Sequence, residues 1–133
     1  MFGPPGHLYV YFTYGMHHCC NVVCRPQGVA GAVLVRALAP LTRVDEMRSR
    51  RPAARRDRDL CSGPGKLCQA LGLDRSFDGA DLLSVSSDVR LLDDGSGPPS
   101  EIAAGPRIGL STQLDTAAEP WRFWVPGEPN VSR

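Results

Sequence analysis

The chain holds 133 residues, of which 42% are hydrophobic and 22% charged, a balance typical of a globular domain with one core. No apolar run approaches the roughly 20 residues needed to cross a bilayer, and the first residues lack the basic and apolar stretches of a signal peptide. A formal charge of +1 and five irregularly spaced cysteines argue against a strongly charged protein and a secreted disulfide framework. These features predict a single cytoplasmic domain over residues 1–133, with reduced thiols and no membrane contact.

The first predicted element is a β-hairpin near the N-terminus. Residues 8–13 alternate with period two, which places Tyr9 and Tyr11 on the face opposite the aliphatic side chains. Residues 14–16 supply the turn, and residues 17–24 return as a second strand. Aromatic residues on a half-buried strand most often belong to a core, but large side chains at an exposed tip favour insertion into a stack of bases.

Neighbouring histidines and cysteines on the returning strand, in the sequence HHCCNVVC, raise the possibility of a zinc site. Adjacent strand residues point to opposite faces, however, and the C-x₂-C spacing of structural zinc sites is missing. We therefore favour small buried thiols and expect no metal. A zinc- or thiol-based module is the weakest of three hypotheses for function.

The next predicted elements are a strand and a short helix. Residues 32–39 are apolar except for Arg36 and predict a strand in the core of the sheet, followed by a helix over residues 41–51. The basic segment Arg43–Arg58 contains seven arginines and three carboxylates, a local charge of +4. Charge alone leaves two interpretations open, a nucleic-acid contact and a solvated arginine-rich loop.

A second helix is predicted within residues 59–71, with Ser62 as its N-cap, Pro64 in its first turn and Gly72 at the C′ position. The sequence SGPGKLC resembles a phosphate loop, but the first Walker glycine and the final Ser or Thr are missing. The sequence still predicts a helix N-terminus beside a lysine. Two interpretations stay open: a site for one phosphate, and a plain capped helix without a ligand.

The rest of the chain predicts short strands separated by turn-rich sequence, at residues 81–85, 89–92, 106–110 and 121–125. The resulting fold class is α+β: a single domain with a mixed, mostly antiparallel sheet, a protruding β-hairpin and a few short helices.

Four blocks of this sequence resemble the alkyladenine (3-methyladenine) DNA glycosylase family of base-excision repair. They occur in the family's order and cover most of the chain: LYVYFTYGMHHCCN from Leu8, VLVRALAP from Val33, RDLCSGPGKLCQALG from Arg58 and WRFWVPGEPNVS from Trp121. The hairpin block and the SGPGKLC block are the most specific. The resemblance implies a DNA glycosylase-like domain over residues 1–133.

The resemblance also implies roles by position. The tip tyrosine, Tyr14, would fill the gap left when a damaged nucleotide rotates out of the duplex, flanked by Met16 and His17. Tyr11 would stack on the flipped base, and Asn21 would exclude the exocyclic amino group of guanine. The remaining implied contacts are Leu34 on the pocket wall and Arg36, Ser62, Gly63 and Lys66 against the DNA.

No cofactor is implied, and the implied partner is double-stranded DNA with a damaged purine, bound by a monomer that is nucleoid-associated in a prokaryote. The family's catalytic glutamate lies in a segment before the first block, and the first acidic residue of this chain is Asp45. We therefore expect a chain truncated at its N-terminus relative to the family, with its catalytic residue unknown. Without a general base, these residues alone should excise little or no base.

Two hypotheses for function, an enzyme and a binding protein, are favoured over the zinc- or thiol-based module. The first is a DNA-repair glycosylase that flips alkylated purines from duplex DNA and hydrolyses their N-glycosidic bond. The second is a non-catalytic damaged-DNA-binding protein of the same fold, which keeps the wedge and the pocket tyrosine but does not cut.

Overall fold

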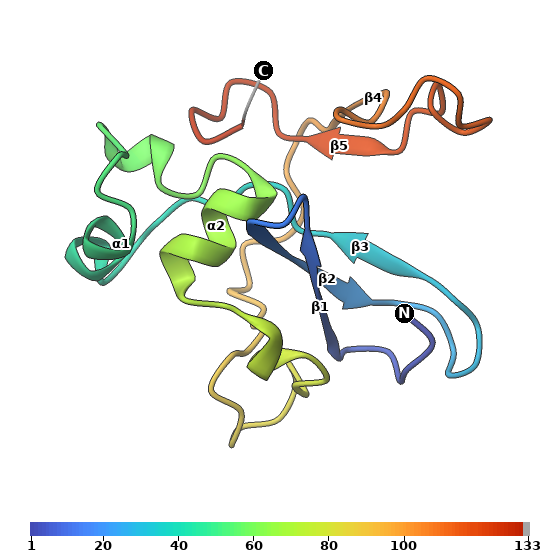
Figure 1. The fold of residues 1–133 in the computed structure, drawn as a ribbon, viewed down its shortest axis with the longest axis horizontal. Coiled ribbons are helices and arrows are strands. Elements are labelled where there is room, and N and C mark those ends of the chain that lie inside the picture. The colour runs from blue at the N-terminus through green and yellow to red at the C-terminus, as the bar shows by residue number, and fades with distance from the viewer. Residues whose placement is uncertain (132–133) are drawn as a thin grey trace.

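The computed structural model describes residues 1–131 (Figure 1). Within them the chain forms a three-stranded and a two-stranded antiparallel sheet, two α-helices and two single 3₁₀ turns. The elements are β1 Leu8–Thr13, β2 His17–Val23, β3 Ala32–Leu34, α1 Val44–Arg50, η1 Asp57–Asp59, α2 Pro64–Leu71, η2 Arg75–Phe77, β4 Ala103–Gly105 and β5 Arg122–Trp124. This confirms the predicted α+β class with antiparallel pairing.

The predicted hairpin is confirmed. β1 pairs with β2 across a three-residue loop, residues 14–16, in which Tyr14 and Gly15 both adopt left-handed φ angles, of 54° and 65°. The amide of Met16 donates to the carbonyl oxygen of Thr13 at 3.3 Å and closes the turn. Positive φ at both central residues is the geometry of a type I′ turn, whose twist matches that of the strands.

The core lies between the aliphatic face of the hairpin and α2. Leu8 and Val10 from β1 and Cys20 from β2 pack with Leu67 and Cys68 of α2 in one buried cluster. Pro64 begins α2, and Gly72 ends it with a φ of 69°. The amides of Gly72 and Leu73 donate back to Gln69 and Cys68, as a C′ glycine should, so this prediction is confirmed.

The strand prediction at residues 32–39 was too long. Only Ala32–Leu34 pairs with β2, at the edge of the sheet rather than in its core, and the Val33 side chain is 60% exposed. The following residues leave the sheet, although Val35 still packs against the core. An apolar run indicates which residues can be buried. It does not show how many of them will pair with the neighbouring strand.

Three other expected strands do not form at residues 81–85, 89–92 and 106–110. Asp81 makes a single bridge to His7, and its carboxylate accepts the amide of Leu83 at 3.0 Å. Short Asp and Ser side chains bind nearby backbone amides and so compete with a strand ladder. The fourth expectation is confirmed, because β5 forms within residues 121–125 and pairs with β4.

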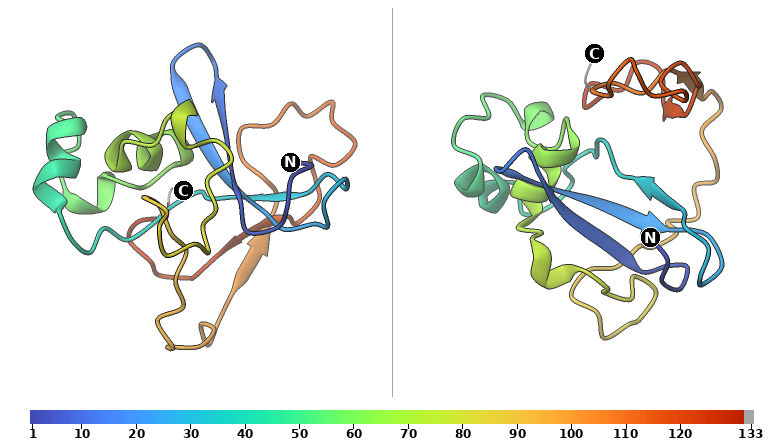
Figure 2. Two further views of the ribbon diagram at one scale, coloured as in Figure 1. Left: turned by 90° about the horizontal axis from the view of Figure 1, so that it is seen from below. Right: turned by 45° about the vertical axis from the view of Figure 1, so that its right-hand side comes forward.

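The C-terminal residues form a separate layer. The β4–β5 sheet and the loops around it lie across from the three-stranded sheet, connected to it by a long irregular segment (Figures 1 and 2). The last residue of the WRFWVPGEPNVS block, Ser132, lies outside the described residues. None of the described helices is both long and apolar enough to pass through a bilayer.

Candidate nucleic-acid interface

The second face of the hairpin carries the tyrosines. The rings of Tyr9 and Tyr11 lie 5.6 Å apart between centroids, at an interplanar angle of 32°. The strand register places Asn21 opposite Tyr9 and Cys19 opposite Tyr11. These four side chains line a cavity of about 1320 Å³, which we call the tyrosine cavity.

Sequence-predicted residues converge on the tyrosine cavity from three parts of the chain. Its lining includes Tyr11, Tyr14, Asn21, Leu34 and Arg36. The opposite wall comes from the C-terminal layer, through residues 107–110 and 121–125. Small-molecule pockets are typically roughly 300–1,000 Å³, so this cavity has room for a nucleoside together with part of its backbone.

The environment of Tyr11 keeps its ring neutral. Burial raises the pKa of Tyr11, and the adjacent, hydrogen-bonded Cys19 raises it further. Burial likewise raises the pKa of the Cys19 thiol. Both groups therefore keep their protons near neutral pH, and the Tyr11 ring presents an electron-rich face that attracts a cation placed over it.

Asn21 is held rigidly beside the tyrosines. Its side chain is 7% exposed, and its amide nitrogen donates to the carbonyl oxygen of Tyr9 at 3.2 Å. On its other side Asn21 pairs with Leu34 of β3. A side chain fixed in this way can exclude a ligand group by contact, because moving it would break a buried hydrogen bond.

Arg36 brings positive charge to the tyrosine cavity from the segment after β3. Desolvation and the nearby Arg122 lower the pKa of Arg36, whereas Cys19 and Tyr11 raise it. Arginine stays charged at physiological pH, so the two guanidinium groups repel each other at the cavity they both line. A phosphate between them would relieve that repulsion.

The hairpin tip projects large side chains into solvent. Tyr14 is 81% exposed and Met16 68%. Holding a non-glycine residue such as Tyr14 at positive φ costs about 1–2 kcal/mol. His17 is also exposed, and its ring lies so close to Gly65 of α2 that a Cβ on the glycine would meet it at 3.1 Å. Met16 and His17 therefore lie near the tip but do not line the tyrosine cavity.

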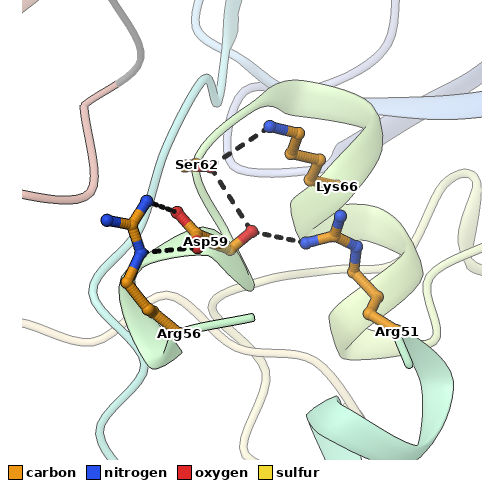
Figure 3. Close-up of polar contacts among 5 residues, drawn as sticks. All are labelled: Arg51, Arg56, Asp59, Ser62 and Lys66. Carbon is orange, nitrogen blue, oxygen red and sulfur yellow. Dashed lines mark hydrogen bonds and ion pairs between the residues drawn. The ribbon is translucent and has the colours of Figure 1, made fainter. Parts of the chain in front are cut away.

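Ser62 does not cap α2 as the sequence predicted. The N-cap is Gly63, which forms no side-chain capping bond. The hydroxyl of Ser62 instead donates to the carbonyl oxygen of Asp59 and accepts from the amine of Lys66, both at 3.4 Å (Figure 3). Gly63 remains buried between them, and neither Ser62 nor Gly63 reaches the tyrosine cavity.

Ser62 and Lys66 line a second cavity of about 830 Å³, which we call the basic cavity. It borders the tyrosine cavity, because both are lined by Arg122, Trp124 and Val125. The predicted DNA contacts of α2 and the predicted base pocket are therefore neighbours in space, although about 30 residues separate Arg36 from Lys66 in the chain.

The sequence reasoning missed the aromatic wall of the C-terminal layer. The guanidinium of Arg107 stacks 5.0 Å from the ring centre of Trp121, and that of Arg122 stacks 4.4 Å from that of Trp124. All four side chains line the tyrosine cavity. The signal was present in the sequence WRFW, where arginine and aromatic residues alternate, a composition typical of nucleic-acid contacts.

The five cysteines are all free thiols, four of them buried, and Cys24 is exposed. A hydrogen bond to Cys20, together with burial, raises the pKa of Cys68. No three His, Cys, Asp or Glu side chains among residues 1–131 gather in a group that could hold a metal ion. Metal analysis of the purified chain tests the zinc hypothesis directly, because stoichiometric zinc would support it.

Comparison with known sequences places this chain in a family. The sequence model of the methylpurine-DNA glycosylase family matches residues 1–129. Because the match covers nearly the whole chain, the chain belongs to the methylpurine-DNA glycosylase family. The family resemblance expected from the sequence blocks is thereby confirmed.

Curated relatives agree with that assignment. Proteins named "Putative 3-methyladenine DNA glycosylase" are 54% identical over 132 residues in Burkholderia lata and 47% identical over 133 residues in Streptomyces avermitilis. A relative of the same name in Mycobacterium leprae is 46% identical over 132 residues. Each alignment covers 99% of this chain but only 59–62% of the relative, so the chain spans about six-tenths of their length.

Proposed function

We propose that this chain supplies the DNA-wedge and base-stacking part of a 3-methyladenine DNA glycosylase in base-excision repair. The observation that carries the proposal is geometric: an exposed aromatic tip stands beside a cavity where Tyr11, Asn21 and Arg36 meet. In this proposal Tyr14, with Met16 and His17 beside it, enters the duplex. The damaged purine rotates into the tyrosine cavity, bounded by Leu34, and Ser62, Gly63 and Lys66 approach the backbone.

The energetics of base flipping fit these residues. Extruding a nucleotide costs a few kcal/mol of stacking and pairing, least at a damaged base. The Tyr14 ring replaces the lost stack within the duplex, and Tyr11 stacks on the extruded base. Alkylated purines such as 3-methyladenine carry positive charge, so the neutral Tyr11 face adds roughly 1–2 kcal/mol of cation–π attraction.

Hydrolysis of the glycosidic bond additionally requires a positioned base to activate water. No acidic residue precedes Asp45, so neither the hairpin nor β3 supplies a carboxylate to the tyrosine cavity. Among the described residues that line this cavity the acid is Glu128, which is exposed in the opposite wall. We therefore expect the 133 residues alone to bind a lesion without releasing its base.

The test uses a duplex that holds one 1,N⁶-ethenoadenine. Binding is measured by anisotropy at fixed salt, and abasic sites by alkaline cleavage, for the chain, Tyr14→Ala and Glu128→Gln. We expect lesion-preferring binding that weakens in Tyr14→Ala, with no cleavage. Cleavage that disappears in Glu128→Gln would assign the base to Glu128. Binding without any lesion preference would overturn the proposed function.

The second candidate is a non-catalytic damaged-DNA-binding protein, favoured by the same lack of a carboxylate beside Tyr11. The two candidates separate when this chain is joined to the part of the Burkholderia lata relative that it does not match. A chimera that forms abasic sites supports the glycosylase, whereas a chimera that only binds supports the binding protein.

A further inference from the structure

The structure divides the arginine-rich segment into engaged and available side chains. Most of its arginines are held by the protein itself. Arg43, Arg48 and Arg56 form ion pairs with Glu46, Asp57 and Asp59 respectively. Arg50 and Arg51 donate to backbone carbonyl oxygens of Ala70, Asp59 and Leu60. Arg50 thereby joins α1 to the end of α2, whereas Arg48 and Arg51 join α1 to η1 and the residue after it. Arg43 and Arg56 pair with acids three residues further along the chain; Figure 3 shows the contacts of Arg51 and Arg56.

Two arginines of the segment, Arg55 and Arg58, have no hydrogen bond or ion pair to any residue within 1–131 and are exposed. They differ in position. Arg58 lines the basic cavity, whereas Arg55 lines neither cavity. The pair therefore offers a comparison between two exposed arginines of one loop, of which one faces a candidate binding surface.

The basic cavity carries excess positive charge. Its charged lining residues are Arg56, Arg58, Lys66 and Arg122 against Asp59 and Glu128. Asp59 already forms a two-pronged pair with Arg56, at 2.9 and 3.1 Å. The amine of Lys66 donates to the Ser62 hydroxyl and to no carboxylate among the described residues. Arg58 and Lys66 thus face the cavity without a carboxylate in an ion pair with them among the described residues, which favours an anionic ligand.

The position of this charge identifies the anion. The basic cavity shares the wall of Arg122, Trp124 and Val125 with the tyrosine cavity. A strand whose nucleotide enters the tyrosine cavity must continue on either side of it, and the next surface in this direction is the basic cavity. Phosphate contacts fix position without reading sequence, so exposed cations such as Arg58 and Lys66 suffice for them.

We infer that Arg58 also contacts the phosphate backbone of DNA next to the flipped nucleotide, in the basic cavity where the proposed function already places Lys66. This inference rests on the proposed function and assigns the DNA contact of the arginine-rich segment to Arg58. The five engaged arginines stabilise the fold of the segment, and Arg55 is assigned neither role.

The experiment measures affinity of the 133-residue chain for an undamaged duplex at several salt concentrations. Each phosphate neutralised by a cation adds about 0.9 to the slope of log K against log salt. Arg58→Gln and Lys66→Gln should each lower the slope by about that amount, while Arg55→Gln keeps the wild-type slope. Arg58→Lys keeps the charge and should keep the slope, because a phosphate contact needs no fork geometry.

Each outcome bears on one hypothesis. An unchanged slope in Arg58→Gln, with a normal wild-type slope and a lowered slope in Lys66→Gln, would overturn the inference and leave the proposed function standing. An equal loss in Arg55→Gln would also overturn it, because diffuse charge would then explain the effect. A wild-type chain that binds neither undamaged nor ethenoadenine DNA would overturn the proposed function itself. Both side chains are exposed, so thermal melting should show the variants folded.

Discussion

The two parts of the molecule on either side of Leu82 are stabilised in different ways. Every member of the buried core lies between Leu8 and Leu82, where the hairpin packs on α2. Among residues 83–131 only Asn130 is buried, and Phe123 is 64% exposed. The first part therefore folds around its own core, while the second adds a short β-ribbon and stacked Arg–Trp pairs. The tyrosine cavity nevertheless takes lining residues from both parts, although only the first part contributes to the buried core.

The largest expected effect tests this separation through stability. Leu67→Ala removes a side chain that is fully buried in the core and should cost about 2–5 kcal/mol in the free energy of unfolding. Phe123→Ala, in the C-terminal layer, should cost less than about 0.5 kcal/mol. Urea denaturation of both variants provides the comparison. Equal losses would mean that the C-terminal layer is packed as tightly as the core.

A second prediction sets stability against binding at the hairpin tip. Tyr14 has a left-handed backbone that glycine adopts without strain. Tyr14→Gly should therefore raise the free energy of unfolding by about 1 kcal/mol. Loss of the aromatic ring should at the same time weaken lesion binding by roughly 10–100-fold, the worth of one base–aromatic stack.

Urea titrations and anisotropy on the same Tyr14→Gly preparation measure both quantities. Gly15→Ala is the matched variant, because it keeps the tyrosine and adds strain at the neighbouring positive φ. It should lose stability and keep lesion preference. If Tyr14→Gly binds the lesion as tightly as the wild type, the proposed insertion of the Tyr14 ring into the duplex is wrong.

These two regions also differ in how far the sequence predicted them. Period-two alternation and the Pro64–Gly72 punctuation are local signals, and both the hairpin and α2 form where those signals lie. Residues 81–85 were also expected to form a strand, but the Asp81 carboxylate and the Ser84 hydroxyl accept nearby backbone amides, and only a single bridge to His7 forms. A local pattern shows which secondary structure a segment can form. It does not show whether a partner strand will pair with it.

The same limit applies to the candidate site. The tyrosine face was predicted because period-two alternation is a local signal, and the register of the hairpin then places Asn21 opposite Tyr9. Arg36 was named from the family resemblance and lies just after β3. The Trp121 and Trp124 wall was missed because it arrives from about 90 residues away, and no local rule fixes where a short ribbon docks. The ion pair between Arg48 and Asp57 was likewise not predictable, since it depends on how η1 folds back onto α1.

A third, smaller effect sharpens the assignment of Tyr11. Tyr11→Leu should lower affinity for a duplex with a cationic alkylated purine about tenfold more than Tyr11→Phe does, because only the aromatic ring provides cation–π attraction. For a neutral lesion such as ethenoadenine, the extra loss on going to leucine should be smaller. Competition binding with the two duplexes measures this difference. Equal losses for both lesions would assign Tyr11 to shape alone.

The smallest effect near neutral pH comes from the buried thiols. Burial raises the pKa of Cys61 and of Cys19 above the ordinary value. Below about pH 8.5, the ordinary cysteine pKa, folded and unfolded chains both keep these protons, so stability should not change. Above it the unfolded chain releases them first, and stability should fall until the pH passes the raised pKa values of the folded chain.

Urea midpoints between pH 7 and pH 10 test this dependence under reducing conditions. Cys61→Ala removes one of the buried thiols and should make the alkaline loss shallower, by up to about 1.4 kcal/mol per pH unit for one proton. Cys24→Ser is the matched control, because it replaces a thiol that lies outside the buried core. An unchanged slope in Cys61→Ala would mean that the core admits water at Cys61, and that the first part of the chain is packed less tightly than its buried cluster indicates.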